Sequence, residues 1–308
     1  MGKPPTTQAQ PSRDESTFQT RHHELPRLEV RCKELSVVIE TEVVNEGLPS
    51  IFDSVKHVAT QFTRRSTTTQ QRVLSQVNAV FKPGTLTLVL GQPRSGKSTL
   101  LKVLSGQFPL AKNVLVKGDI SYNGLAWKEM LPKLPQLAAY VPQNDRHFPS
   151  LTVQETLEFA HACCEGDTLS RQGKQVKQRP DGIIDQLGLN SCRDTKIGNE
   201  MTRGVSGGER RRATTGEMAF GAKCAAFMDE ISTGLDSATT FDIVWRQRKI
   251  AKKQRKTVVM ALLQPAPEVV ELFDNLLLLN NGEVLYHGPR EQVLPYFQQL
   301  GLRCPPRR

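Results

Sequence analysis

Short apolar runs recur along the chain and alternate with longer segments that carry apolar residues on one helical face. Four of the runs are strand-sized: residues 85–90, 224–228, 257–263 and 276–279. Between the first two, residues 99–105 place Leu100, Leu101 and Leu104 at helical spacing. Alternation of buried strands with helices is typical of a parallel sheet covered by helices. The pattern therefore predicts an α/β fold with a largely parallel core sheet.

Other stretches predict strands and turns outside this alternation. Residues 28–39 alternate at their start, as an edge strand or a half-buried strand would, and residues 73–81 are a second candidate strand. Asn281-Gly282 predicts a tight hairpin turn after the last apolar run. Residues 1–24 are polar and rich in Pro, Gln, Thr and Ser, so we expect a disordered tail before a domain that covers residues 25–308.

The composition is that of a globular protein. Hydrophobic residues make up 38% of the 308, and no apolar run approaches the roughly 20 residues that a membrane-spanning helix needs. The amino terminus shows no apolar core of a secretory signal. The six cysteines form no C-x-x-C pair, which favours reduced thiols in the cytosol over a disulfide framework or a zinc site.

The net charge of +10 raises the question of an anionic partner. The densest basic cluster covers residues 246–256. A solvated helix face is its main explanation, and anionic lipid near a cytoplasmic leaflet is the alternative. No aromatic residue interleaves the cluster, which argues against stacking on single-stranded nucleic acid, so no nucleic-acid partner is expected.

The strongest motif follows the first apolar run. It reads Gly91, Gln92, Pro93, Arg94, Ser95, Gly96, Lys97, Ser98 and then Thr99, which matches the P-loop spacing G-x-x-x-x-G-K-S. The backbone N–H groups of such a loop, together with the N-terminus of the helix after it, bind phosphate. Lys97 is expected to reach the β- and γ-phosphates of a nucleotide, and the Ser98 hydroxyl is expected to ligate Mg²⁺.

Two carboxylates follow the second apolar run. A buried strand over residues 224–228 would place Asp229 and Glu230 at the edge of the sheet that faces the ligand crevice. Asp229 would hold Mg²⁺, directly or through water, and Glu230 would orient the water that attacks the γ-phosphate. An ordinary strand followed by an acidic turn is the alternative, and the P-loop upstream argues against it.

A second anion-binding loop precedes these carboxylates. Ser206, Gly207 and Gly208 open a polar helix, and a helix start of this kind can also grasp a phosphate. One chain with two such loops and one acidic strand makes sense if the second loop serves the nucleotide of another subunit.

Taken with its neighbours, this loop makes the sequence resemble the ATP-binding cassette (ABC) ATPases, whose signature motif it matches. Gln143, in Tyr-Val-Pro-Gln, matches the glutamine of the family's Q-loop, and residues 232–237, with Asp236, match its D-loop. The motifs run from Gly91 to Ser237 in the family's order. Finer similarity, in residues 118–124, 151–156, 214–218 and 228–236, is to the G-type, pleiotropic-drug-resistance subfamily. Residues 262–268 and 286–289 resemble the first, N-terminal cassette of its full-size members.

The resemblance implies a fold and a task. The fold would add a small antiparallel β subdomain and an α-helical subdomain, at about residues 144–208, to the core sheet. Two cassettes would close head to tail around two ATP molecules, with Gln143 as a further Mg²⁺ ligand. ATP hydrolysis would power export of hydrophobic compounds, xenobiotics or lipids through transmembrane domains, which places the cassette on the cytoplasmic face of a membrane.

Two positions depart from the family's pattern. Leu263 stands where the family usually has a switch histidine, and a leucine cannot hydrogen-bond the γ-phosphate or the attacking water, so hydrolysis could be impaired. Phe62 is a candidate for the aromatic residue that stacks on adenine, although a linker or core phenylalanine is the more common case. An ATP-binding but catalytically weak regulatory cassette and a soluble, non-transport ABC ATPase therefore stay open as alternatives.

Overall fold

The computed structural model describes residues 27–42, 68–165, 179–221 and 223–303. The tail expected over residues 1–24 and the candidate Phe62 lie outside the described residues.

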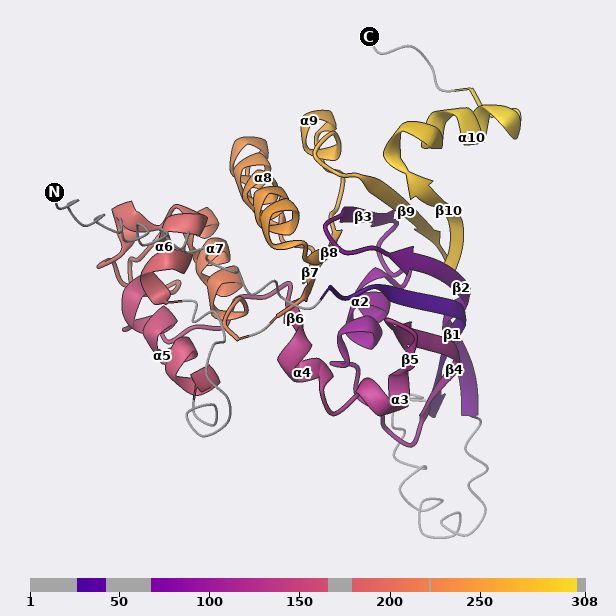
Figure 1. Cartoon of the computed structure of the whole chain (residues 1–308), viewed down its shortest axis with the longest axis horizontal. Helices are drawn as coiled ribbons and strands as arrows, with labels where there is room; N and C mark the ends of the chain where they lie inside the picture. Colours follow the sequence, from indigo (N-terminus) through magenta and orange to yellow (C-terminus); the bar gives the residue numbers. More distant parts are fainter. Residues whose placement is uncertain (1–26, 43–67, 166–178, 222, 304–308) are drawn as a thin grey trace, which may run out of the picture.

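A six-stranded sheet forms the centre of the molecule (Figure 1). Its strand order is β10-β9-β3-β8-β7-β6. The strands are β3 (Leu86–Gly91), β6 (Ala138–Val141), β7 (Ala225–Asp229), β8 (Thr257–Ala261), β9 (Asn275–Asn280) and β10 (Glu283–Pro289). Neighbours pair in parallel except β9 and β10, which are antiparallel. The structure thus confirms the largely parallel α/β sheet, and it places β3 and β7 on either side of β8.

The turn between β9 and β10 is the hairpin that Asn281-Gly282 predicts. Both residues have positive φ, 47° and 82°, as a two-residue hairpin turn requires. A Cβ on Gly282 would lie 2.4 Å from the carbonyl oxygen of Val73, so only glycine fits there. The Gly282 N–H also donates to the carbonyl oxygen of Ser95 at 3.1 Å, which ties the hairpin to the P-loop.

A second, antiparallel sheet has the order β2-β1-β4-β5. Its strands are β1 (Val30–Glu42), β2 (Thr68–Phe81), β4 (Val114–Tyr122) and β5 (Leu125–Ala126). Because β1 pairs with β2 on one side and β4 on the other, it is not the edge strand that its pattern allowed. The alternative holds, since Val30, Cys32 and Leu35 are buried between exposed residues.

Helices cover both sheets and form a group of their own. They are α2 (Lys97–Ser105), α3 (Trp127–Met130), α4 (Leu134–Leu137), α5 (Val153–Glu165), α6 (Pro180–Leu187), α7 (Gly207–Glu217), α8 (Ser237–Gln254), α9 (Pro267–Val270) and α10 (Val293–Gln299), with short 3₁₀ turns η2 (Asn190–Cys192) and η3 (Arg290–Gln292). Figure 1 shows α5, α6 and α7 together at one end of the molecule. In the part of the chain that the structure describes, no helix has both the length and the hydropathy to cross a membrane.

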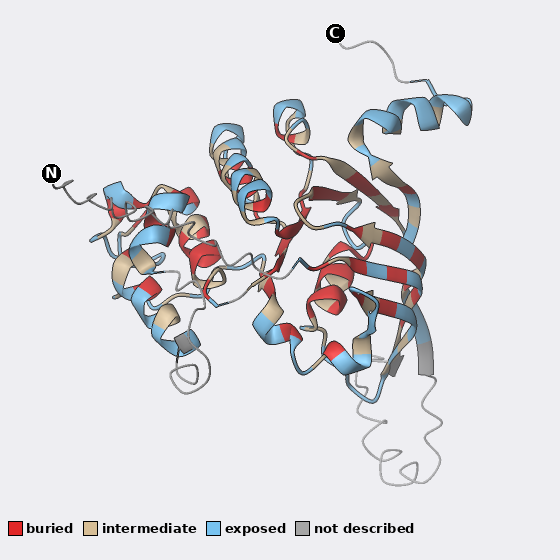
Figure 2. Ribbon diagram, in the orientation of Figure 1, coloured by how far each residue is buried: buried red, intermediate tan, exposed pale blue. Residues whose placement is uncertain are grey.

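Buried side chains form three clusters. One joins the antiparallel sheet to α2 and the central sheet, and a second packs α8 and α9 against the same central strands. Figure 2 shows these buried positions along the strands and α2, while α10 is largely exposed. The third cluster runs from Val153 to Phe220 and holds α5, α6 and α7 together. It is a separate core where the helical subdomain was expected, and it includes α7, which lies mostly beyond residue 208.

Candidate functional site

The P-loop joins the end of β3 to the start of α2 and depends on two glycines. A Cβ on Gly91 would lie 2.4 Å from the carbonyl oxygen of Leu279, so β9 packs too closely for any other residue. Gly96 has φ 96°, and its Cβ would lie 2.6 Å from Leu74. Arg94 also has positive φ, 66°. The tight turn brings the exposed residues 92–94 outside and the buried residues 95–97 inside.

Lys97 lies under this loop. Its side chain is 3% exposed, and its ammonium donates to the carbonyl oxygens of Gly91 and Gln92, each at 3.0 Å. The Ser95 hydroxyl oxygen is buried and has no hydrogen-bond partner. Thr99 is half-buried in the first turn of α2. An ammonium, an unpartnered hydroxyl and the positive end of a helix in one loop fit a bound phosphate.

Asp229 is the last residue of β7 and is 3% exposed. Both of its carboxylate oxygens accept hydrogen bonds at 2.9 Å: Oδ1 from the Ser98 hydroxyl and Oδ2 from the Tyr140 hydroxyl. The pairing of β6 with β7 brings Tyr140 here, opposite Phe227. Burial, and then the charge of Asp229, raise the pKa of Tyr140 well above its usual range, so the hydroxyl stays a donor.

The sequence motif around Gln143 includes Tyr140 but predicts no role for it. The signal that could have found it is its place at the end of a short apolar segment, because the ends of neighbouring parallel strands meet at one edge of a sheet.

Glu230 sits just past β7 in a left-handed backbone conformation, with φ 46°, and its N–H donates to the carbonyl oxygen of Ala261 at 2.9 Å. Its Oε2 accepts from the Gln143 side-chain amide at 2.8 Å. Its Oε1 lies 3.7 Å from the Lys97 ammonium. The structure therefore brings the P-loop, the acidic strand end and the candidate Q-loop glutamine together in one place.

The second loop is in another place. Ser206 caps the N-terminus of α7 in a capping box with Glu209: the Glu209 N–H donates to the Ser206 hydroxyl at 3.3 Å, and the Ser206 N–H donates to Oε2 of Glu209 at 2.8 Å. Gly207 is exposed, whereas Gly208 packs so closely on Thr239 that a Cβ there would clash at 2.4 Å. Among the described residues, no hydrogen bond or ion pair links residues 206–208 to residues 91–99.

Two more candidate residues lie away from the P-loop contacts. Asp236 is the N-cap of α8, and its Oδ2 accepts from the Thr239 N–H at 3.1 Å. Leu263 is half-buried and follows β8 by two residues. Ala261, at the end of β8, is opposite Asp229 in the β7–β8 register, so Leu263 leaves the sheet on the side of the two carboxylates.

A parallel sheet with a P-loop after one strand and an acidic end on another defines a P-loop nucleotide-binding ATPase domain. The family model for the ABC transporter matches residues 74–233, just over half of the chain, and the chain belongs to this family.

The chain is also similar to curated transporters from plants. It is 38% identical over 316 residues to ABC transporter G family member 30 of Arabidopsis thaliana, and 41% identical over 318 residues to ABC transporter G family member 37 of Oryza sativa subsp. japonica. Each alignment covers 92% of this chain and 22% of the relative, so the chain spans about a fifth of the length of these transporters.

A solved structure supports the fold alone. A bacterial ABC transporter cassette, determined as a dimer, matches with a TM-score of 0.60 at 18% identity, over 85% of this chain and 98% of that one. The α/β fold of an ABC ATPase cassette, predicted from the motifs, is therefore confirmed.

Proposed function

We propose that this cassette binds ATP with Mg²⁺ at residues 91–99 and hydrolyses it with Glu230 as the residue that orients water. The contact of Glu230 with both Lys97 and Gln143 carries the proposal, because a carboxylate held beside the P-loop lysine would be suited to orient water towards a γ-phosphate. The buried hydroxyl of Ser95 supports it, since a phosphate oxygen would give this hydroxyl the partner it lacks.

Each group has a part that its surroundings favour. Lys97 would exchange the carbonyl oxygens of Gly91 and Gln92 for the β- and γ-phosphates. The Ser98 hydroxyl oxygen and Oδ1 of Asp229 lie 2.9 Å apart, and both are oxygen ligands suited to Mg²⁺. The side-chain amide of Gln143 donates its N–H to Glu230, which leaves the side-chain carbonyl oxygen of Gln143 for the metal. When bound, Mg²⁺ would neutralise charge that develops on the β- and γ-phosphates. Glu230 would accept a proton from the attacking water.

We further propose that a second cassette completes this site. Ser206, Gly207 and Gly208 lie at the N-terminus of α7, away from the chain's own P-loop, and a helix N-terminus of this kind favours a phosphate from another subunit. Asp236, at the start of α8, would lie at the same interface. Head-to-tail closure would give each ATP one P-loop and one signature loop.

The similarity to long G family transporters supports a place in an export machine. In this proposal the chain is the first cassette of a full-size transporter, on the cytoplasmic face of a membrane. Transmembrane domains would carry hydrophobic compounds, xenobiotics or lipids, and closure of the cassettes would power this transport.

Binding of ATP to the isolated chain tests the site. Lys97→Ala removes the buried ammonium and is expected to weaken ATP binding by tenfold or more, since a charged hydrogen-bond donor is worth about 1.5–3 kcal/mol. Lys102→Ala, on the last turn of the same helix, is the matched control and should leave affinity unchanged. Equal affinity for Mg-ATP in wild type and Lys97→Ala, by titration calorimetry, would overturn the assignment.

Slow hydrolysis is a second candidate property, and Leu263 is the observation that favours it. The carbonyl oxygen of Ala261, two residues before Leu263, accepts a hydrogen bond from the Glu230 N–H. Leu263 therefore leaves the sheet near Glu230, the proposed water-orienting residue. A leucine there supplies no hydrogen bond to the transition state.

A further inference from the structure

A small cavity lies between three helices and the central sheet. Its walls come from α6, α7 and α8 and from the strands β6, β7 and β8. Most of the wall is apolar, with Val141, Leu187, Met218, Ile250 and Val258 among its residues. The volume is about 30 Å³. Since one water needs about 10–15 Å³, the cavity has room for roughly two waters or one small ligand, and none for a nucleotide.

The charged residues in this wall are both lysines. Lys223 and Lys256 line the cavity, and none of the described residues that line it is acidic. Lys223 is half-buried, and its ammonium donates to the carbonyl oxygen of Pro135. Lys256 follows α8 by two residues and is 5% exposed. No described residue accepts a hydrogen bond from the Lys256 ammonium or forms an ion pair with it.

The isolated charge of Lys256 is costly to bury. A buried ammonium is normally compensated for its lost hydration by a counter-charge and by hydrogen bonds. Burial lowers the pKa of Lys256 to about 8, so at pH 7 the group keeps most of its charge. The titratable groups that act on it do not balance this charge. Burial raises the pKa of the Cys224 thiol, which stays neutral, and Lys223 is itself a cation.

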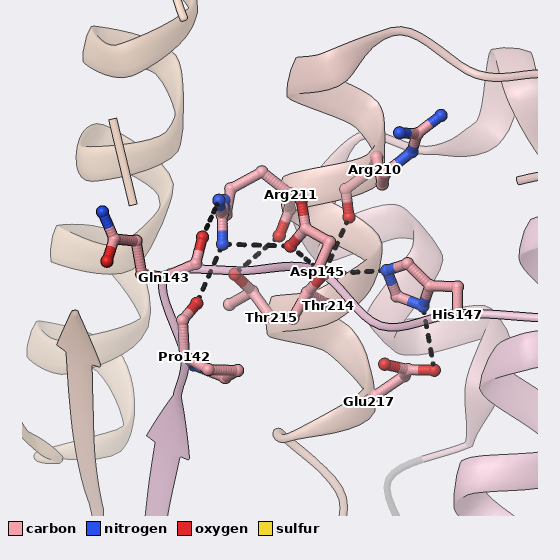
Figure 3. A network of polar contacts seen from close by, with 9 residues as sticks. All are labelled: Pro142, Gln143, Asp145, His147, Arg210, Arg211, Thr214, Thr215 and Glu217. Atoms are coloured by element: carbon pink, nitrogen blue, oxygen red, sulfur yellow. Dashed lines mark hydrogen bonds and ion pairs between the residues drawn. The ribbon is translucent and has the colours of Figure 1, made fainter. Parts of the chain in front are cut away.

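Two glutamines of α8 line the same cavity. Gln247 and Gln254 are seven residues apart, which places them on one face of the helix, two turns from each other. Gln247 is 4% exposed, and no described residue hydrogen-bonds its side chain. Oε1 of Gln254 is buried and also lacks a partner. The Thr215 hydroxyl of α7, in contrast, already donates to the carbonyl oxygen of Arg211 at 2.9 Å (Figure 3).

We propose that this cavity binds a small monovalent anion, best a short carboxylate such as acetate, with Lys256 as its counter-charge. The ammonium and the amide N–H of Gln247 donate to the carboxylate oxygens, in hydrogen bonds that the anionic charge strengthens. The apolar part of the wall meets the methyl group. A nucleotide is too large for the cavity, and a phosphate brings a second charge that the wall does not balance.

The cavity is separate from the proposed ATP site. None of residues 91–99 lines it, so the proposal does not depend on nucleotide binding. It borders α7, which Arg211 fastens to the end of β6 by donating to the carbonyl oxygens of Pro142 at 2.9 Å and Gln143 at 2.6 Å (Figure 3). A bound anion would neutralise the charge where α7, α8 and the sheet meet, and would so stabilise the packing of these elements.

Thermal unfolding of the nucleotide-free chain measures the binding. Acetate is titrated at pH 7 and constant ionic strength, with gluconate, which is too large for the cavity, as the balancing anion. At ten times its Kd, acetate should raise the Tm of the wild type by about 2–4 °C. Lys256→Met keeps the length of the side chain without its charge and should weaken acetate binding at least tenfold. Lys253→Met, at an exposed position of α8, is the matched control and should respond like wild type.

Further arms locate the anion and identify it. Lys97→Ala should respond to acetate like wild type, and Gln247→Met should bind it about tenfold more weakly. Acetate should bind more tightly than chloride, because its methyl group meets the apolar wall. Its affinity should fall as pH rises from 7 to 9.5, since the anion binds only the protonated Lys256.

Three results would overturn the proposal. The first is an equal acetate response in wild type and Lys256→Met, or no saturable response in either. The second is a response lost in Lys97→Ala, which would place the anion in the P-loop. The third is tighter binding of chloride than of acetate, which would refute the carboxylate as the occupant.

Discussion

The side-chain amide of Gln143 donates to Oε2 of Glu230 across 2.8 Å, although 87 residues separate the two in the sequence. The contact joins the end of β6 to the end of β7, and it holds the carboxylate on the side of Lys97. Glu230 keeps a strained backbone, with φ 46°, and the bond from its N–H to Ala261 maintains this conformation. These contacts together fix the orientation of the Glu230 carboxylate.

Removal of the amide should release this carboxylate. We expect Gln143→Ala to lower the rate of ATP hydrolysis about tenfold or more, because a misplaced water-orienting group loses its alignment with the phosphate. ATP affinity should change much less, since Lys97, the P-loop backbone and two of the three proposed Mg²⁺ ligands, Ser98 and Asp229, are untouched. Single-turnover hydrolysis beside calorimetric titration separates the two effects. A loss of affinity as large as the loss of rate would contradict the role given to this contact.

Leu263 gives a prediction in the opposite direction. If the missing donor limits turnover, then Leu263→His should raise the rate of hydrolysis by at most about a hundredfold and leave ATP affinity nearly unchanged. The gain should vanish in the double variant with Glu230→Gln, because both residues act on the same water. An unchanged rate in Leu263→His, with Glu230→Gln inactive, would mean that Gln264 or a partner residue supplies the donor.

The hairpin glycine Gly282 allows a stability test with an internal control. Gly282→Ala would add strain at φ 82° and a clash with the Val73 carbonyl oxygen, while Gly124→Ala at φ 85° meets nothing within 4 Å. We expect a loss of about 1 kcal/mol for Gly124→Ala and about 2–4 kcal/mol for Gly282→Ala, by urea unfolding. The Gly282 N–H donates to the carbonyl oxygen of Ser95 in the P-loop, so ATP affinity should fall in Gly282→Ala and not in Gly124→Ala. An equal loss of stability in the two variants would show that the close contact of Gly282 with Val73 of β2 adds no cost.

Lys256 is 5% exposed, and burial lowers its pKa from an ordinary value near 10.5 to about 8. The unfolded chain then binds more protons than the folded one between about pH 8 and pH 10.5, so this residue makes the protein more stable as pH rises through that window. Below pH 8 the cost of the buried charge is fully present. Lys256→Met should therefore stabilise the protein at pH 7, by at most about 3 kcal/mol, and the gain should shrink towards pH 10.

Thermal unfolding at pH 7 and pH 9.5 measures this difference. Lys253→Met, at an exposed position one residue before the end of α8, is the matched control and should change little at either pH. A gain of the same size at both values of pH would assign the effect of Lys256→Met to packing rather than to charge.

The parts of the site that were predictable are those whose chemistry is local. The spacing of Gly91, Gly96 and Lys97 specifies the loop, since the strand, the turn and the helix are continuous in sequence. Asn281 and Gly282 specify their hairpin for the same reason. The P-loop residues and the acidic strand end do lie together, and their catalytic roles stay predictions that the measurements above would test.

Other features depend on which distant segments pair, and no local pattern reports that. The alternation at Val30 and Cys32 fits an edge strand as well as a central one, and only the pairing with β4 decides between them. The hydroxyl of Tyr140 meets Asp229 because β6 lies beside β7. The side chain of Arg211 bonds the carbonyl oxygens of Pro142 and Gln143, which lie 69 and 68 residues away in the sequence. The sequence shows that such groups exist, but their partners follow from the topology.

The capping box at the start of α7 bears on how two cassettes could meet. The carboxylate of Glu209 accepts from both the N–H and the hydroxyl of Ser206, and these bonds lower the pKa of Glu209, so the group is an anion already seated at this helix end. A phosphate that binds there would compete with the Glu209 carboxylate for the hydrogen bonds of Ser206. If a second nucleotide binds at this loop as proposed, its binding would exchange one anion for another, and its strength would be the difference between the two.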